Sequence, residues 1–285
     1  MQASAHILPC GKRLHLQHGP IDLIIGADGD RQAAFHAATT RFATILQELV
    51  AELPDLKRPL SNGTPIPQGS VAKRMDTATR PFIETGFVTR MAAVAGSVAD
   101  CIMHAMAQTP ITRAYVNNGG DIALHLTQGQ SFSLAMAGHD GTDLGRITVH
   151  HEDPIRGIAT SGRLGRSHSL GIADSVTVLA PTAACADVAA TLIANAVDLP
   201  NHPAISRRPA CDLDDTSDLG AHPVVVGCNA LSAADSARAL ARGRARANSY
   251  IARDLITGAA LFVQNKSITT CPAHLTIAQR SLSHA

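Results

Sequence analysis

The sequence contains no tryptophan, and aromatic residues make up only 3% of its 285 residues. Its formal net charge is +1, so it also lacks the basic surplus that attracts a nucleic-acid backbone. With few rings for base stacking and little net charge, the chain is not expected to bind nucleic acid. Because no stretch approaches the roughly 18 apolar residues of a membrane span, we expect no membrane association and a cytoplasmic location.

The sequence also lacks cysteine pairs with the CxxC spacing of zinc knuckles. Its six cysteines are scattered along the chain, at Cys10, Cys101, Cys185, Cys211, Cys228 and Cys271. This spacing favours neither a zinc site nor a disulfide scaffold, so we expect reduced thiols with structural roles. The hydrophobic content is 45%, enough for a single large domain over residues 1–285. Residues 1–20 and 271–285 are expected to lie at its periphery.

Apolar residues recur every three or four positions in several segments, a spacing that is typical of helices. Over residues 30–53 this spacing predicts a helix that Pro54 ends. Residues 55–82 contain SNGTPIPQGS and are expected to form an irregular surface connection. Further helices are expected in the segments 91–107, 182–197 and 232–252.

Short strands separated by turn sequences predict an antiparallel meander in the middle of the chain. Its four strands are expected at 113–116, 122–126, 131–138 and 145–152. Further strands are expected at 157–160, 175–179, 223–228 and 258–264. We therefore predict an α+β fold with antiparallel sheets flanked by helices, arranged as two intimately packed halves.

Two glycine-containing motifs follow strands and have two interpretations each. The first motif consists of Asn118, Gly119, Gly120 and Asp121. It is either a type I′ hairpin turn or a backbone edge that a ring or a phosphate approaches. The second motif, Thr160, Ser161 and Gly162, is either a serine-rich turn or a set of hydroxyl and amide groups that contact an anion or a flavin.

The predicted helix 182–197 carries a polar stripe in an otherwise apolar segment. Asp187, Thr191 and Asn195 lie four residues apart and therefore share one face. Asp187 and Thr191 either form a magnesium site or interact with the helix dipole and backbone. In the helix 91–107, Gly96 costs about 1 kcal/mol relative to alanine, which indicates that a neighbour or a ligand approaches closely there.

Other polar clusters are weaker candidates. His168 and Asp174 lie on either side of Gly171 and meet only if the loop folds back, so the histidine is either catalytic or structural. Adjacent residues of the run 150–153 point to opposite faces of a strand, which disfavours a metal site. The run 212–218 lacks the EF-hand spacing and is expected to be a solvated loop, and 26–30 is expected to be a turn.

As a set, NNGGDI, ATSG and SVTVLAPTAACADVAAT resemble the ApbE-like superfamily, which includes FAD:protein FMN transferases. The segments MAAVAGSVAD, TSGRLGRSHSLGIADSVTV and ADVAATLIANAV, with DLG near Leu219, are similar to the UPF0280 family, a branch of that superfamily. The resemblance extends over about residues 22–264. It implies that the chain has the ApbE-like fold.

The resemblance also implies a binding site for FAD or FMN and for Mg²⁺. Asp187 and Thr191 match the metal-binding Asp-x-x-x-Thr pair, and the backbone near Val94 and Ala95 matches a segment that contributes a carbonyl. The implied cofactor-binding residues are Asn118, Gly119, Gly120, Asp121, Thr160, Ser161, Gly162, Gly96 and Asp100. Two features depart from the family pattern: Ala95 replaces a lysine, and HSLGIADS replaces the HiiDPxTG loop.

The implied activity is transfer of FMN from FAD to a threonine of an acceptor flavoprotein, with release of AMP. His168 and Asp174 are the candidates for activating the acceptor hydroxyl. The alternatives are a non-catalytic flavin or nucleotide carrier and a different small-molecule enzyme on the same scaffold. A homodimer is a further hypothesis that the sequence leaves open.

Overall fold

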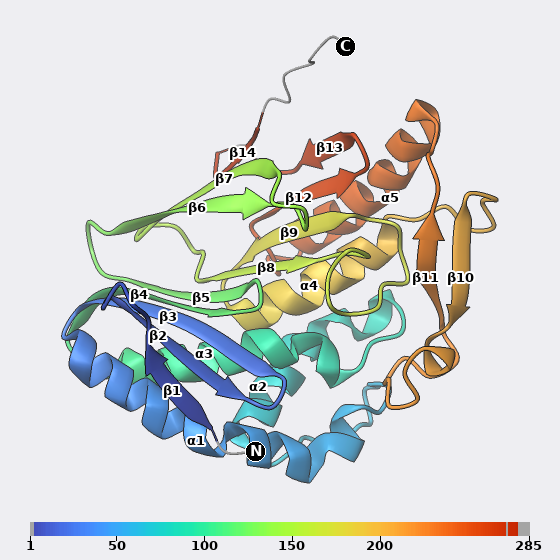
Figure 1. Ribbon diagram of the computed structural model, residues 1–285. Helices are drawn as coiled ribbons and strands as arrows, with labels where there is room; N and C mark the ends of the chain where they lie inside the picture. The colour runs from blue at the N-terminus through green and yellow to red at the C-terminus, as the bar shows by residue number, and fades with distance from the viewer. Residues whose placement is uncertain (1–2, 272, 279–285) are drawn as a thin grey trace.

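The computed structural model describes residues 3–271 and 273–278, which are organised around one large antiparallel sheet (Figure 1). The sheet has nine strands in the order β1-β2-β3-β4-β5-β8-β9-β12-β13. Their bounds are β1 (Ser4–Ile7), β2 (Arg13–His18), β3 (Ile21–Gly29), β4 (Ile111–Asn118), β5 (Asp121–Leu126), β8 (Gly157–Ser161), β9 (Ser175–Ala180), β12 (Gly258–Val263) and β13 (Lys266–Thr269). The predicted α+β class with antiparallel sheets is confirmed.

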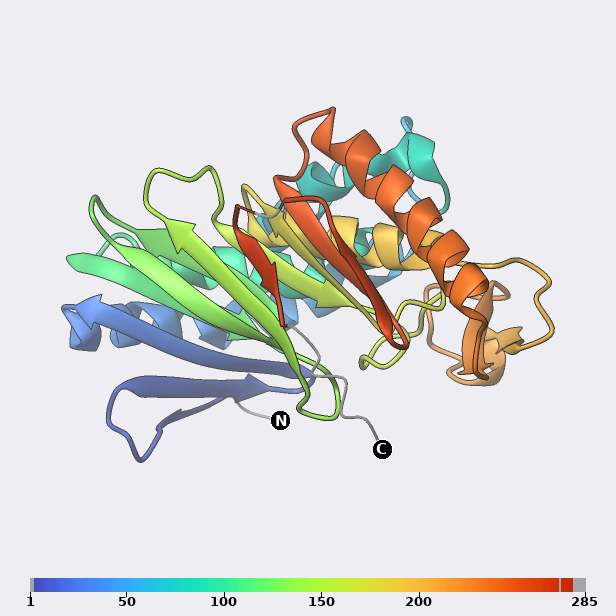
Figure 2. The ribbon, with the colours of Figure 1, turned by 90° about the horizontal axis from the view of Figure 1, so that it is seen from above.

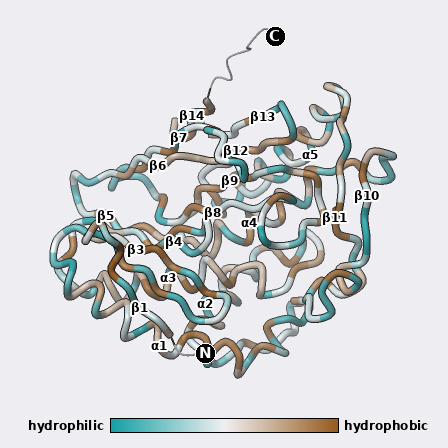
Figure 3. Tube along the Cα trace, viewed as in Figure 1, coloured by the Kyte–Doolittle hydropathy of each residue, from teal (hydrophilic) through white to brown (hydrophobic). Residues whose placement is uncertain are grey.

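The helices cover one face of this sheet (Figure 2). They are α1 (Arg31–Leu56), α2 (Ser70–Thr79), α3 (Val94–Met106), α4 (Ala183–Ala196) and α5 (Ala233–Ile251). The described residues also form three short 3-10 helices, η1 (Arg80–Thr85), η2 (Arg90–Ala93) and η3 (Ala210–Asp212). Apolar residues along β3 and β4 supply part of the covered face (Figure 3). None of the helices in the described residues combines the length and the apolar character needed to cross a bilayer.

A smaller sheet packs on the opposite face of the large one. Its strands are β6 (Ser131–Ala137), β7 (Asp143–His150) and β14 (Leu275–Ile277), in the order β14-β7-β6. Side chains of β9 alternate between the two sides: Val176 and Val178 face the helices, whereas Leu179 faces the smaller sheet. Because both faces are covered, β9 and β12 are buried along their whole length. A separate hairpin contains β10 (Ile205–Pro209) and β11 (Pro223–Cys228).

Several details of the predicted elements are wrong. The helix α1 continues past Pro54 to Leu56, and the segment 55–82 contains α2 instead of only irregular chain. In α2 the buried carboxylate of Asp76 accepts hydrogen bonds from Arg80 and from the fully buried Arg90. This internal ion pair anchors the segment against the core, although its Pro and Gly content predicts a surface loop.

The meander prediction is wrong beyond its second strand, because β5 pairs with β8 while β6 and β7 belong to the smaller sheet. Residues 26–29 complete β3 instead of forming a turn, and Asp30 caps α1 by accepting a hydrogen bond from the Ala33 amide. In the C-terminal segment, β14 adds a strand with Leu275 buried, and residues 279–285 lie outside the described part of the chain.

Candidate functional site

A cavity of about 1040 Å³ lies at the end of the sheet where β4 turns into β5. Its volume is at the upper end of the range for small-molecule sites. Apolar residues of α1 and β6 line one part of it, and polar residues from the strand ends, one loop and α4 line another. Of the residues predicted to form a site, the cavity is lined by Asn118, Gly119, Gly120, Asp121, Thr160, Ser161, Gly162, Asp174, Asp187 and Thr191.

Asp187 enters the cavity from α4, and Thr191 lies one helical turn farther along on the same face. One carboxylate oxygen of Asp187, Oδ2, accepts a hydrogen bond of 2.9 Å from the Gly96 amide. A Cβ atom at Gly96 would lie 2.3 Å from the carbonyl oxygen of Ala183, so only glycine allows α3 to approach α4 this closely. The predicted steric role of Gly96 is therefore confirmed, and the close neighbour is the backbone of α4.

Asp100 fixes the other contact between these helices. Its carboxylate accepts hydrogen bonds from the amides of Ala183, at 3.1 Å, and Ala184, at 2.9 Å, which are the first residues of α4. Burial raises the pKa of Asp100 to about 6. Neither Gly96 nor Asp100 is among the residues that line the cavity. Both lie behind it and hold the helix that carries Asp187.

The turn between β4 and β5 forms the hairpin that its sequence predicts and also borders the cavity. Gly119 and Gly120 have φ values of 66° and 114°, which favour glycine. Asn118 is buried, and its Nδ2 donates a hydrogen bond of 3.1 Å to the carbonyl of Ala95. The turn is thereby tied to the start of α3, so the backbone near Ala95 is positioned beside the cavity.

Asp121 and Asp187 form a pair of partly desolvated carboxylates. Burial raises the pKa of Asp121 to about 7, while the positive charge of Arg166 opposes this shift. Burial raises the pKa of Asp187 well above its usual value, and the negative charge of Asp121 raises it further. The two carboxylates therefore destabilise each other's charged forms, which makes this end of the cavity suited to a cation.

Arg166 is a cavity residue that the sequence analysis did not identify. Its guanidinium lies against the turn: a Cβ atom at Gly119 would be 1.8 Å from Nη2 of Arg166. Arg166 also lines the cavity, and its positive charge lowers the pKa of Asp121. The only signal in the sequence was a second arginine in the loop GRLGRS, and spacing alone does not indicate where that loop folds.

The motif at the end of β8 lines the cavity through Thr160, Ser161 and Gly162. The hydroxyl of Thr160 lies 3.0 Å from the hydroxyl of Thr177 on β9. At Gly162, φ is 154°, and a Cβ atom would lie 2.5 Å from the carbonyl oxygen of Asp174. Glycine at this position thus allows the strand end to pass close to the chain that carries Asp174.

The two candidate catalytic residues occupy different environments. His168 is exposed and is not among the residues that line the cavity. Asp174 lines the cavity, but its Oδ1 lies 2.5 Å from Nη2 of Arg163, and its Oδ2 accepts a hydrogen bond from the Gln264 amide. In the described residues, no hydrogen bond or ion pair joins His168 to Asp174.

Asn195, the third residue of the polar stripe on α4, accepts a hydrogen bond of 2.9 Å from the Leu170 amide.

In the parts of the chain that the structure describes, no group of three or more His, Cys, Asp or Glu side chains has metal-binding geometry. In the run 150–153, the His151 ring contacts the Leu126 carbonyl, and Asp153 accepts a hydrogen bond from the His150 amide. In the run 212–218, Asp212, Asp214 and Asp215 are exposed. A metal in the cavity would therefore depend on carboxylate, hydroxyl and phosphate oxygens together.

Comparison with known proteins gives both family and fold similarities. The family model described as AbpE bacteria matches residues 5–270. A UPF0280 protein of Methanopyrus kandleri is 37% identical over 157 residues, which are 55% of this chain and 61% of that protein. A UPF0280 protein of Methanosphaerula palustris is 31% identical over 172 residues, or 59% of this chain and 71% of that protein.

A third relative, the UPF0280 protein of Methanothrix thermoacetophila, is 36% identical over 140 residues, or 49% of this chain and 55% of that protein. The matched regions thus span 55–71% of these three relatives. Among solved structures, a mutant form of the flavin transferase ApbE from Vibrio cholerae has a TM-score of 0.50 and 13% identity, over 95% of this chain and 98% of that chain. At this identity the similarity concerns the fold alone.

Proposed function

The chain belongs to the AbpE bacteria family and to the UPF0280 proteins, and from this premise we propose that its cavity binds a flavin nucleotide, FAD or FMN, with Mg²⁺. The observation that carries the proposal is the meeting of two carboxylates, Asp187 and Asp121, with the cation Arg166 at one end of a single cavity. A pyrophosphate with a divalent cation needs both kinds of group. The apolar part of the cavity suits a flat ring system.

The donor set fits a magnesium ion. Asp187 supplies a carboxylate and Thr191 a hydroxyl, and Mg²⁺ prefers oxygen ligands of this kind together with water and phosphate oxygens. The Asp187 carboxylate accepts hydrogen bonds from the Gly96 and Ala95 amides, and because a carboxylate has about four lone-pair sites, sites remain for a metal. When bound, Mg²⁺ would neutralise negative charge on the phosphates. Because burial and Asp121 disfavour the charged form of Asp187, a nearby cation would also relieve that cost.

The remaining polar groups have distinct roles in this proposal. Arg166 binds a phosphate and compensates for the missing family lysine at Ala95. The hydroxyls and amides of Thr160, Ser161 and the Gly119–Gly120 turn orient the nucleotide. Walls from α1 and β6 exclude water from the ring, which strengthens the electrostatic contacts at the polar end.

We extend the proposal to transfer of FMN from FAD to a threonine hydroxyl of an acceptor flavoprotein. The hydroxyl oxygen forms a bond to the phosphorus of the FMN part as the bond from that phosphorus to the AMP oxygen breaks, so AMP leaves. Asp121 accepts the hydroxyl proton. Asp121 lines the cavity beside Asp187 and takes the role that the sequence suggested for His168 and Asp174.

A non-catalytic flavin carrier is the second candidate. It is favoured by the exposed position of His168 and by the ion pair that engages Asp174 with Arg163. The carrier and the transferase share the same binding site, so they differ only in whether FAD is consumed.

The binding proposal is tested by titrating riboflavin, FMN and FAD into the protein, with and without Mg²⁺, and following flavin fluorescence. We expect FMN and FAD to bind more tightly than riboflavin, and Mg²⁺ to increase the affinity for both nucleotides. Asp187→Asn should abolish the magnesium effect, while the exposed control Asp215→Asn should retain it. Absence of FMN and FAD binding at millimolar concentration would overturn the proposal.

Transfer is tested by separating FAD, FMN and AMP after incubation with Mg²⁺ and candidate acceptor proteins. Magnesium-dependent AMP release that Asp121→Asn removes would support the transferase. FAD that binds but stays intact with every acceptor would favour the carrier. Equal AMP release by wild type and Asp187→Asn would exclude transfer at this site.

A further inference from the structure

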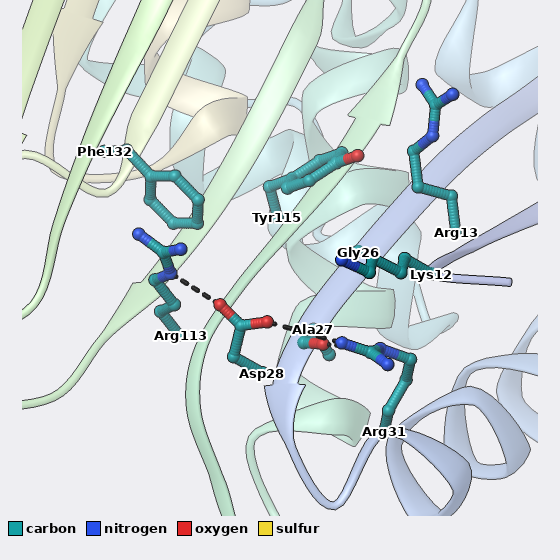
Figure 4. A pocket seen from close by; sticks show the side chains of 9 residues that line it. All are labelled: Lys12, Arg13, Gly26, Ala27, Asp28, Arg31, Arg113, Tyr115 and Phe132. Carbon is teal, nitrogen blue, oxygen red and sulfur yellow. Dashed lines mark hydrogen bonds and ion pairs between the residues drawn. The ribbon is translucent and has the colours of Figure 1, made fainter. Parts of the chain in front are cut away.

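A second, smaller pocket lies away from the cavity, on the face of β3 and β4 that is turned from the helices (Figure 4). We call it the strand-face pocket; its volume is about 200 Å³, and it shares no lining residue with the cavity. Strand alternation places Tyr115 on this face, whereas Ala114 and Val116 point into the helix-side core. The pocket is thus a separate feature of the same sheet.

Positive charge is concentrated in the strand-face pocket. Four cationic side chains and one carboxylate line it, which leaves three positive charges in excess in a protein with a net charge of only +1. The carboxylate belongs to Asp28, which accepts hydrogen bonds from Arg113, at 2.7 Å, and from Arg31, at 3.4 Å. Asp28 is therefore already engaged. The remaining cations of the pocket are Lys12 and Arg13.

Lys12 and Arg13 form no ion pair with a carboxylate in the described residues, and both are exposed at the mouth of the pocket. In Figure 4 the Lys12 side chain extends over Gly26, and Arg13 lies beyond the hydroxyl end of Tyr115. Arg13 hydrogen-bonds to Cys10 and to the Tyr115 hydroxyl, neither of which is a carboxylate. Lys12 and Arg13 beside the hollow therefore offer charge-assisted hydrogen bonds to an anion. The pocket therefore has a cationic mouth.

The wall of the pocket is aromatic. The rings of Tyr115 and Phe132 meet edge to face with centroids 6.1 Å apart, and the guanidinium of Arg113 lies 5.3 Å from the Phe132 centroid. The chain has only two tyrosines, and one of them is here. A Cβ atom at Gly26 would lie 2.5 Å from Cε1 of Tyr115, so glycine allows that ring to lie flat on the strand.

We propose that the strand-face pocket binds a small aromatic anion, a single planar ring that carries a phosphate or a carboxylate. Lys12 and Arg13 bind the anionic group, and the ring packs against Tyr115 and Phe132. The volume of about 200 Å³ admits one ring with its anionic group, which is smaller than the flavin system assigned to the cavity. This binding is independent of the proposed flavin site.

The test is a titration of the full chain with phenyl phosphate and with benzoate, followed by calorimetry. Inorganic phosphate and phenol are the reference probes, because each carries only half of the recognised chemistry. We expect at least one of the aromatic anions to bind more tightly than either reference probe. Whether phenyl phosphate or benzoate binds with the higher affinity indicates whether the pocket prefers a phosphate or a carboxylate.

Variants distinguish this site from the cavity and from general surface charge. The double variant Lys12→Ala with Arg13→Ala should weaken the aromatic anion by about tenfold or more. Phe132→Leu should weaken the aromatic anion and leave inorganic phosphate unchanged. The controls Arg166→Gln, in the cavity, and Arg242→Ala, exposed on α5, should have no effect.

Three outcomes would overturn the proposal. One is equal binding of phenyl phosphate, benzoate and both reference probes. The second is that Arg166→Gln lowers the affinity for the aromatic anion while the Lys12 and Arg13 substitutions leave it unchanged, which would place the probe in the cavity. The third is an equal loss from Arg242→Ala, which would indicate unspecific attraction to a basic surface.

Discussion

Replacing Gly96 with alanine is expected to separate α3 from α4 and to displace Asp187. The new methyl group would lie 2.3 Å from the oxygen and 2.5 Å from the carbon of the Ala183 carbonyl, so backbone must move. Overpacking of this kind costs about 1–3 kcal/mol, and misplacing the amide that binds Asp187 costs about 1–3 kcal/mol more. Alanine returns about 1 kcal/mol as a better helix former, so we expect a net loss of about 1–5 kcal/mol.

We measure the loss of stability by urea unfolding and by thermal unfolding. At about 2 °C per kcal/mol for a chain of this size, it lowers the thermal midpoint by about 2–10 °C. The matched control is Gly63→Ala, because a Cβ atom at Gly63 meets nothing within 4 Å. The control should stay within about 0.5 kcal/mol of wild type. If Gly96→Ala were as stable as Gly63→Ala and bound FMN like wild type, the close helix contact would not position Asp187.

Three further changes have defined outcomes. Burial raises the pKa of Asp100 from its ordinary value of 3.8 to about 6 in the folded state. Its contribution to stability is therefore present at low pH and is lost as pH rises through about 6. Urea unfolding should show the stability of wild type relative to Asp100→Asn falling by up to about 3 kcal/mol between about pH 4 and pH 7; a constant difference would refute this. Arg90→Ala, which breaks a buried ion pair, should cost about 3–5 kcal/mol in urea unfolding, whereas the exposed pair of Arg58 should contribute less than about 1 kcal/mol. Burial raises the pKa of Cys185 to about 12, whereas a hydrogen bond from Arg13 lowers the pKa of the exposed Cys10. An alkylating reagent should therefore modify Cys10 well before Cys185 in the native protein, as followed by mass spectrometry.

Features with strong local patterns were predictable from the sequence. The four-residue spacing of Asp187 and Thr191 places them on one helix face, and the structure puts both in the cavity. The NNGG sequence predicts the β4–β5 hairpin because asparagine and glycine tolerate positive φ. The unfavourable glycine at position 96 indicated a close approach before the neighbour was known.

Features that depend on contacts between distant segments were not predictable. The sequence patterns of β5 and β6 do not reveal that β5 pairs with β8. The pairing depends on how the smaller sheet packs its apolar side chains against the large sheet. The buried ion pair of Arg90 with Asp76, which orders the segment around α2, joins residues 14 positions apart. Arg166 reaches the turn at Gly119 across the fold, so no spacing rule identifies it as part of the site.

A crystal structure of the protein with FMN, and with Mn²⁺ replacing Mg²⁺ as an anomalous scatterer, would locate ligand and metal together. We expect the flavin in the cavity, its phosphate beside Arg166, and the Mn²⁺ peak between Asp187, Thr191 and the phosphate. A flavin bound outside the cavity, or a metal peak away from Asp187 with the flavin in place, would contradict the proposed site.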